Sequence, residues 1–328
     1  MILRILKTNQ AYHFILIPLL VAGLWFRSYI DPVYFPYFEG ENDMFLYRFV
    51  HQWVAHSALL SNLLSMFFVI VFSFLILKLN TEYAFIRVRT FLPSNIFVLI
   101  IGGLITLHTL HPVYFALLFL LLCVDRIFQS YEKEKFHDSA FEAGFLIGLG
   151  SLFYLNLVFF FPIIWVGFAL IKKRPQWRNF ALPVLGLAVP WLFTWSYHYL
   201  TNQLPAFWDT ILVNFETENS FFSGNTPLQV YLGYLMLVSF LGGIFLLNQY
   251  DEKKISTRKN FQVFFLITLI AFALLLFVPA VSQEIVVIMS LPLTYLISNY
   301  LIFMKQKFWG NLFVYLFIAL IIYLQFVS

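Results

Sequence analysis

The chain has 328 residues, of which 61% are hydrophobic, 21% aromatic and only 11% charged, with a mean hydropathy of +0.84. Soluble domains carry about 25% charged residues because a folded surface must be hydrated, so the low charged content excludes an ordinary soluble enzyme. The high apolar content excludes a disordered chain. The formal net charge is +4, and the single cysteine, Cys123, excludes an internal disulfide and a cysteine-based metal site. The sequence therefore predicts an all-α polytopic membrane protein.

Eleven stretches approach the roughly 20 mostly apolar residues that a helix needs to cross the hydrocarbon of a bilayer. In chain order they are 12–30, 58–79, 95–110, 112–128, 139–155, 156–171, 180–200, 227–248, 261–279, 282–303 and 308–326. No small-residue cleavage site follows the first stretch, which we interpret as an uncleaved helix. The pairs at 95–128 and 139–171 are each divided only by a short polar break. If either pair were one bent helix, the alternation of sides would change.

The distribution of basic residues predicts the sidedness of these segments. With the N-terminus in the cytoplasm, the inner loops contain 18 of the 20 Lys and Arg, and only Arg27 and Arg48 remain outside. Cytoplasmic loops of membrane proteins carry such an excess of Lys and Arg. The pattern predicts about 11 transmembrane helices, with the N-terminus cytoplasmic and the C-terminus external.

Two long loops, 31–57 and 201–226, are both predicted to be external and are too long to act only as connectors. They carry most of the predicted external acids, which are Asp31, Glu39, Glu41, Asp43, Asp209, Glu216 and Glu218, with Glu284 in a shorter connection. In the first loop, apolar residues follow at helical spacing: Phe45, Phe49, Val50, Trp53 and Val54. This spacing predicts an amphipathic helix that lies at the outer membrane interface.

Few side chains inside the predicted segments suggest transport or metal chemistry. Asp125 and Glu142 lie near the inner ends of their segments, from which they can reach the headgroups. A coupled transporter usually keeps an ionisable group near the middle of the membrane. His108 and His111 have a spacing that can hold a metal, but no third ligand is evident. No phosphate-binding loop of the GxxxxGK type is present, which disfavours direct use of ATP.

The layout resembles that of integral-membrane glycosyltransferases of the GT-C type. In that family a seven-helix module has a long external loop after helix one, with an acidic residue and an interfacial helix, and another long external loop after helix seven. The stretch Glu41-Asn42-Asp43-Met44-Phe45-Leu46-Tyr47-Arg48 is similar to the family's acidic residue and the Tyr-Arg pair that follows it, although the family commonly has adjacent Asp and Glu. Residues 141–177 are similar to its fifth and sixth helices, with Tyr154-Leu155-Asn156 where the family usually has a Lys or Arg.

The resemblance implies a module at 1–226, followed by four additional transmembrane helices at 227–328 that match nothing specific. It also implies a location in the bacterial inner (cytoplasmic) membrane and transfer of a sugar from a polyprenyl-phosphate donor, such as a polyprenyl-phosphomannose, to an acceptor at the external face. Membrane lipid, the polyprenyl-phosphate sugar and further protein subunits are the expected partners, and no nucleic acid is expected. A degenerate, non-catalytic relative would share the layout.

Such a transfer needs a carboxylate that takes the proton of the acceptor hydroxyl and a cation that neutralises the departing phosphate. Asp43 is the first candidate for the base, Glu41 the second and Asp31 the third; Arg48 and Arg27 are the candidates for the lipid phosphate. A divalent metal ion can also supply the positive charge, but the sequence assigns it no ligands.

Each of these residues also has a simpler interpretation. Asp31 precedes a proline, as in many turns; the loop acids can be solvated; and both arginines can contact headgroups without binding a substrate. Gly144, Gly148 and Gly150 are interpreted as sites of close helix packing.

The sequence leaves two further functions open. The chain can be a non-catalytic membrane subunit or scaffold of an envelope-biogenesis or export complex, or it can be a transporter of a lipid-linked substrate.

Overall fold

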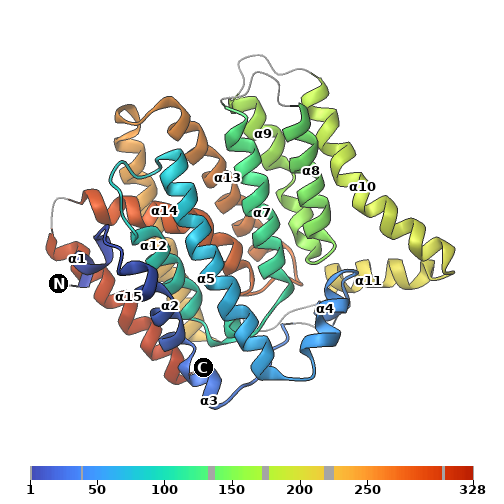
Figure 1. Ribbon diagram of the computed structural model, residues 1–328, viewed down its shortest axis with the longest axis horizontal. Coiled ribbons are helices and arrows are strands. Elements are labelled where there is room, and N and C mark those ends of the chain that lie inside the picture. Colours follow the sequence, from blue (N-terminus) through green and yellow to red (C-terminus); the bar gives the residue numbers. More distant parts are fainter. Residues whose placement is uncertain are drawn as a thin grey trace.

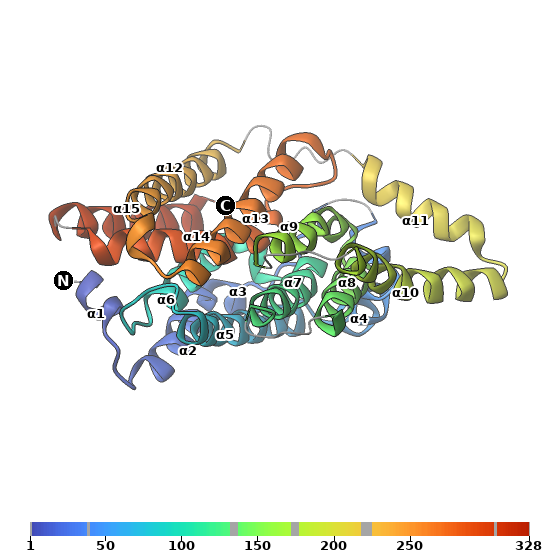
Figure 2. The ribbon, with the colours of Figure 1, turned by 90° about the horizontal axis from the view of Figure 1, so that it is seen from above.

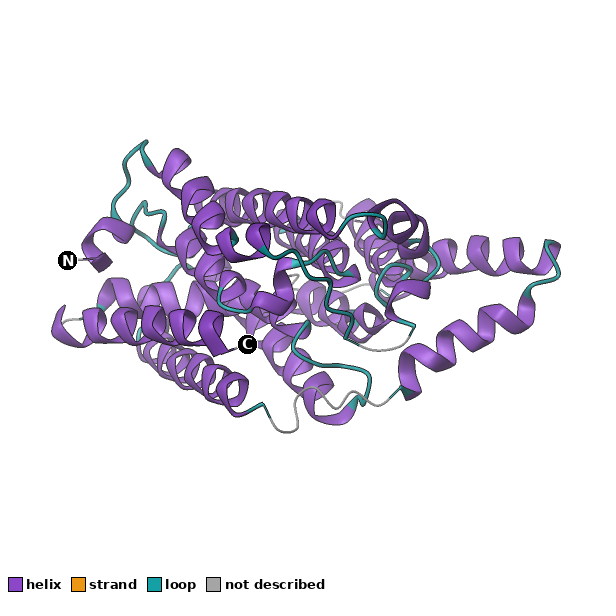
Figure 3. Ribbon diagram, turned by 90° about the horizontal axis from the view of Figure 1, so that it is seen from below, coloured by secondary structure: helices purple, strands orange, loops and turns teal. Residues whose placement is uncertain are grey.

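The computed structural model describes residues 2–37, 40–131, 137–171, 177–217, 225–304 and 307–327, and in this part of the chain it contains helices and no strands (Figures 1 and 3). The helices are α1 (Ile2–Lys7), α2 (His13–Leu24), α3 (Phe26–Ile30), η1 (Glu41–Asp43), α4 (Tyr47–Val54), α5 (Ala58–Tyr83), α6 (Leu92–Gly102), η2 (Ile105–His108), α7 (Pro112–Gln129), α8 (His137–Ser151), η3 (Leu155–Phe160), α9 (Pro162–Ile171), α10 (Arg178–Leu200), α11 (Leu204–Glu216), α12 (Thr226–Asn248), η4 (Tyr250–Glu252), α13 (Ile255–Phe277), α14 (Ile285–Phe303) and α15 (Lys307–Val327). Two predicted external acids, Glu39 and Glu218, lie outside the described residues, as do six predicted inner cations: Lys133, Lys135, Lys172, Lys173, Arg174 and Lys305.

Seven helices in the described part of the chain are long and apolar enough to cross a membrane: α5, α7, α10, α12, α13, α14 and α15. An α-helical, multi-pass membrane protein is therefore confirmed. The four other predicted segments contain helix that is shorter or interrupted. The break after α6 falls at Gly102 and Gly103, and α9 begins at Pro162, after a 3-10 turn. Glycine and proline favour helix ends at these positions because glycine is flexible and proline lacks an N–H group.

Helix α14 lies at the centre of the bundle and contacts α6, α7, α12 and α13. It is buried on all faces, and the hydroxyl of Tyr295 on this helix donates a hydrogen bond to the carbonyl oxygen of Ile76 on α5 at 2.8 Å. A helix that is apolar all round is expected in such a central position.

The connections at one end of the bundle come together. In Figure 1, α4 and α11 both lie at the lower end, where α5 begins and α10 ends. The side chain of Ser57 caps α5 by accepting a hydrogen bond from the Leu60 N–H at 3.3 Å. The side-chain oxygen of Asn225 caps α12 by accepting a hydrogen bond from the Leu228 N–H at 3.2 Å. Helices α10 and α11 form an arm that projects beyond the other helices (Figures 2 and 3). The two loops predicted to be external therefore meet at one end of the molecule.

Close packing of α8 against α10 holds the base of this arm. A Cβ atom at Gly144 or Gly148 of α8 would overlap the backbone of α10 at Pro183 and Leu187, and one at Gly186 of α10 would overlap the backbone of α8. The predicted role of Gly144 and Gly148 in close helix packing is thus confirmed. Gly150 instead faces side chains, those of Phe119 and Leu157.

We expect Gly144→Ala to lower the stability of the purified protein by about 1–3 kcal/mol, because an added methyl group in a closely packed contact forces the helices apart. Gly233→Ala is the matched control, since Gly233 lies within α12 and a Cβ there would meet no atom within 4 Å. At that position alanine should be neutral or stabilising by up to about 1 kcal/mol. Thermal unfolding of both variants in detergent tests the contact, and equal transition temperatures would contradict it.

Candidate functional site

The first long loop turns sharply before its helical part. Gly40 adopts φ 90°, in the left-handed region that glycine favours, and its carbonyl oxygen accepts a hydrogen bond from the Asp43 N–H at 3.0 Å. The same oxygen accepts a hydrogen bond at 3.3 Å from the side-chain amide of Asn214, on α11. The turn that carries the candidate acids is therefore fixed to the second long loop.

Helix α4 lies at Tyr47–Val54, so the predicted helix in the first loop is confirmed. Tyr47 and Val54 are buried, whereas Phe49 is 53% and Trp53 80% exposed. Two aromatic side chains of α4 are thus largely exposed, as expected for a helix at a membrane interface.

A small apolar cluster joins the two loops to the ends of the long helices. Its buried members are Met44, Phe45, Tyr47, Leu152, Leu155 and Phe207. The N–H of Leu46 donates to the carbonyl oxygen of Leu152 at 3.1 Å. The hydroxyl of Tyr47 donates to the carbonyl oxygen of Leu110 at 2.7 Å. The loop is therefore positioned by contacts with the ends of α7 and α8.

Asp43 and Arg48 line one cavity of about 300 Å³ between α4, α10 and α11. Its polar lining residues are Asp43, Arg48, Thr194, His198, Gln203 and Thr210. Phe45, Phe49, Phe193 and Tyr197 contribute aromatic walls. The structure thus brings together the first candidate base and the first candidate phosphate ligand, both of which have exposed side chains.

His198 is a cavity residue that the sequence did not single out. Its Nδ1 donates to the carbonyl oxygen of Thr194 at 2.8 Å, so in the neutral ring Nε2 is the acceptor. The rings of Phe45 and Phe207 lie 5.1 and 5.5 Å from the imidazole. The signal in the sequence was weak, because a histidine near a helix end is common and its partners come from other segments.

The guanidinium of Arg48 lies 6.0 Å from the ring centroid of Phe49, its neighbour on α4. Two ion pairs of the described residues are His111–Glu41 and Arg126–Glu142. Neither pair involves Arg48 or Asp43. The carboxylate and the guanidinium therefore face the cavity without neutralising each other through a direct contact.

Glu41, the second candidate base, is buried behind this turn and paired with His111. The Nδ1 of His111 donates to Oε1 of Glu41 at 2.7 Å, and Oε2 accepts from the Tyr37 N–H at 2.8 Å. The other ring nitrogen of His111 lies 2.9 Å from the carbonyl oxygen of Thr106. The same nitrogen lies 2.8 Å from the Thr109 hydroxyl, and the two fixed acceptors, the Glu41 carboxylate and the Thr106 carbonyl oxygen, favour the protonated imidazole. Burial acts to lower the pKa of His111, but the adjacent Glu41 carboxylate raises it above its ordinary value.

Glu284 is a second buried carboxyl group, next to the start of α14. Its Oε1 accepts a hydrogen bond from the Tyr154 hydroxyl at 3.2 Å, and both oxygens lie 3.0 Å from the Ser282 N–H. Burial raises the pKa of Glu284 to about 7, with a further contribution from the charge of Glu41. The sequence placed Glu284 among the external acids but gave no sign of its burial, because its side-chain partner Tyr154 lies 130 residues away.

The remaining candidates lie apart from the cavity. Arg27 and Asp31 are exposed at either end of α3, and neither is among the residues that line the cavity with Asp43. His108 stacks on Trp25 with ring centroids 4.0 Å apart, and its Nδ1 lies 2.7 Å from the Ser28 hydroxyl. In the described part of the chain no three His, Cys, Asp or Glu side chains form a group that could hold a metal. Among these residues, a divalent metal ion, the alternative source of positive charge, thus has no ligand set to which it can be assigned.

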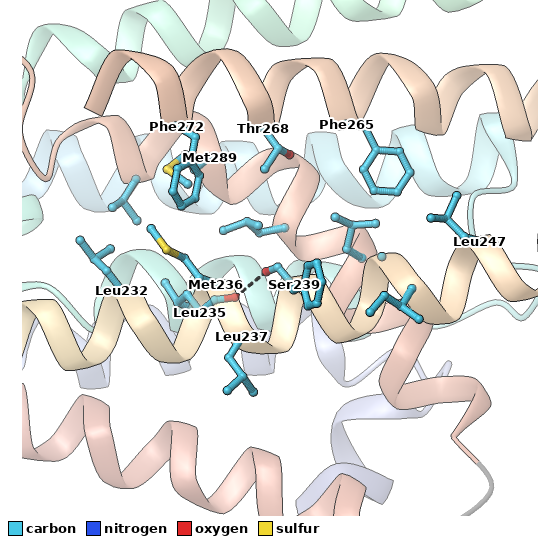
Figure 4. A pocket seen from close by; sticks show the side chains of 16 residues that line it. Leu232, Leu235, Met236, Leu237, Ser239, Leu247, Phe265, Thr268, Phe272 and Met289 are labelled. Carbon is cyan, nitrogen blue, oxygen red and sulfur yellow. Dashed lines mark hydrogen bonds between the residues drawn. The ribbon is translucent and has the colours of Figure 1, made fainter. Parts of the chain in front are cut away.

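A second cavity, of about 670 Å³, lies between α12, α13 and α14 (Figure 4). Its lining is apolar except for Ser239 and Thr268. The hydroxyl of Ser239 donates to the Leu235 carbonyl oxygen at 2.6 Å, and that of Thr268 to the Phe264 carbonyl oxygen at 2.9 Å. Both hydroxyls are thus satisfied within their own helices, and the cavity offers hydrocarbon contact without groups for chemistry.

No protein-family model matches the chain, and neither the curated proteins nor the solved structures include a match to it. The function is therefore argued from the residues and their geometry.

Proposed function

We propose that the chain is a GT-C-type glycosyltransferase of the bacterial inner membrane that uses a polyprenyl-phosphate sugar at the external face. The observation that carries the proposal is the cavity in which Asp43 and Arg48 of the first loop meet polar residues of α10 and α11. The proposal includes the eleven spans, with a cytoplasmic N-terminus, that the distribution of Lys and Arg predicts.

In the proposed reaction, the acceptor hydroxyl oxygen forms a bond to the anomeric carbon of the sugar. The bond between that carbon and the phosphate oxygen of the donor breaks, and polyprenyl phosphate leaves with the bonding electrons. Asp43 takes the acceptor proton as the new bond forms, and Arg48 neutralises charge on the departing phosphate. The exposed aromatic side chains around the cavity provide apolar contact for the first part of the isoprenoid chain.

Glu41 has a supporting role in this proposal. It is 2% exposed and already accepts hydrogen bonds from His111 and Tyr37, so an acceptor hydroxyl has no access to it. The buried pair holds the turn from which Asp43 projects, two residues further along the chain.

Replacement of Arg48 tests the phosphate contact. We expect Arg48→Gln to weaken binding of polyprenyl phosphate about ten- to a hundredfold, because a hydrogen bond to a charged group contributes about 1.5–3 kcal/mol. Arg27→Gln is the matched control, since Arg27 is the other predicted external cation and does not line the cavity. Equilibrium binding of a fluorescent polyprenyl phosphate in detergent micelles measures both. Equal losses in the two variants would contradict the assignment.

A further inference from the structure

A third cavity, of about 610 Å³, lies where the connection between α1 and α2, the end of α5 and the loop from α5 to α6 meet. Helix α5 begins after the Ser57 cap and is 26 residues long, with a rise of about 1.5 Å per residue. The cavity lies at the opposite end of this helix from the cap. The cavity therefore lies toward the end of the bundle that the basic residues predict to be cytoplasmic.

The lining of this cavity has two chemically different parts. Arg87 and Arg89 supply positive charge, and no carboxylate is present among the described residues that line it. Asn9 and Gln10 add side-chain amides. Phe14, which is 54% exposed, forms an apolar wall on α2.

The loop that carries both arginines is held in place by contacts on either side of them. Phe85 is fully buried, with its ring centroid 4.7 Å from that of Tyr295 and 4.8 Å from that of Phe264. The Oδ1 of Asn80 accepts a hydrogen bond from the Ile86 N–H at 3.1 Å, and the Thr90 hydroxyl donates to the Lys7 carbonyl oxygen at 2.8 Å. The backbone that carries the two cations is thus already ordered, which reduces the entropy cost of ordering this loop when a ligand binds.

We propose that this cavity binds the headgroup of an anionic phospholipid of the inner leaflet. Arginine binds phosphate oxygens through two parallel N–H donors, and basic pockets between transmembrane helices on the cytoplasmic side are suited to anionic headgroups. The apolar wall favours a lipid over free phosphate, and α2 carries further exposed apolar side chains beside it, since Ile15 and Leu19 are 73% and 66% exposed. The hydrocarbon chain of the lipid contacts α2 at Phe14 while its phosphate lies between the arginines.

The proposal is tested with the full chain reconstituted in nanodiscs of phosphatidylcholine, with and without 20% phosphatidylglycerol. We expect phosphatidylglycerol to raise the transition temperature of the wild type by several degrees. The double variant Arg87→Gln/Arg89→Gln should lose this increase and should retain at least tenfold less phosphatidylglycerol in native mass spectrometry. The control is Arg178→Gln, which removes an exposed cation at the start of α10. Arg178 is also on the predicted cytoplasmic side, and we expect this variant to behave as the wild type.

Four results would overturn the proposal. An equal transition temperature of the wild type in the two lipid compositions would do so, whether or not the double variant folds. Undiminished retention of phosphatidylglycerol by the double variant would show that the lipid binds elsewhere. Stabilisation of the wild type by inorganic phosphate to the same extent would assign a free anion instead, and displacement of phosphatidylglycerol by an acidic peptide would assign a protein partner. None of these measurements depends on glycosyl transfer.

Discussion

Asp43→Asn is expected to lower the rate of sugar transfer about 10²- to 10⁴-fold, the range that a positioned general base contributes. Asparagine keeps the size of the side chain but cannot accept the proton of the acceptor hydroxyl. Since Asp43 is exposed at the cavity and is not part of a described ion pair, the substitution should leave the transition temperature unchanged. Release of polyprenyl phosphate from a radiolabelled polyprenyl-phosphate mannose in proteoliposomes measures the rate.

Asp209→Asn is the control for this loss. Asp209 lies on α11 of the same arm, is exposed, and does not line the cavity. The control removes the same charge from the same end of the molecule and should keep full activity. Wild-type activity in the Asp43→Asn variant would contradict the role of this carboxylate and would favour a non-catalytic subunit or scaffold.

Glu41→Ala is expected to lower the stability by about 3–5 kcal/mol, the usual cost of removing one partner of a buried ion pair. The substitution leaves the buried His111 side chain without its carboxylate partner and the Tyr37 N–H without its acceptor. Chemical unfolding in detergent, followed by tryptophan fluorescence, measures the loss. The effect should appear as a lower denaturant midpoint.

Glu216→Ala provides the matched control, because Glu216 is an exposed carboxylate at the end of α11, and its loss should change stability by less than about 0.5 kcal/mol. In the double variant Glu41→Ala/His111→Ala the loss should be smaller than the sum of the two single losses, since the two residues act as a pair. Additive losses would show that the two side chains stabilise the loop independently.

The sequence was sufficient to predict where helices form, because hydropathy and helical spacing are local properties. All predicted segments contain helix, and the helix at Tyr47–Val54 was predicted from the spacing of its apolar residues. The interruption near Gly102 and Gly103 was not predicted, because apolar residues continue on both sides of the two glycines. Hydropathy therefore locates a segment without showing whether its helix is continuous.

The candidate site was predicted in part. Asp43 and Arg48 were selected from one loop, but the contribution of His198 depends on how α10 and α11 fold back toward α4. The distinction between Asp43 and Glu41 also needed the structure, because the two acids are two residues apart and only the pairing with His111 shows which one is buried. Such pairings between distant segments leave no local pattern in a single sequence.

Photocrosslinking tests the central claim most directly, with a polyprenyl phosphate that carries a diazirine on the first isoprene unit. After illumination in nanodiscs and digestion, mass spectrometry locates the adducts. The proposed site predicts adducts on α4 and on residues 193–210, which an excess of unlabelled polyprenyl phosphate removes. Adducts that gather in the apolar cavity between α12, α13 and α14, or that match the pattern of a diazirine phospholipid, would contradict a donor site between the two loops.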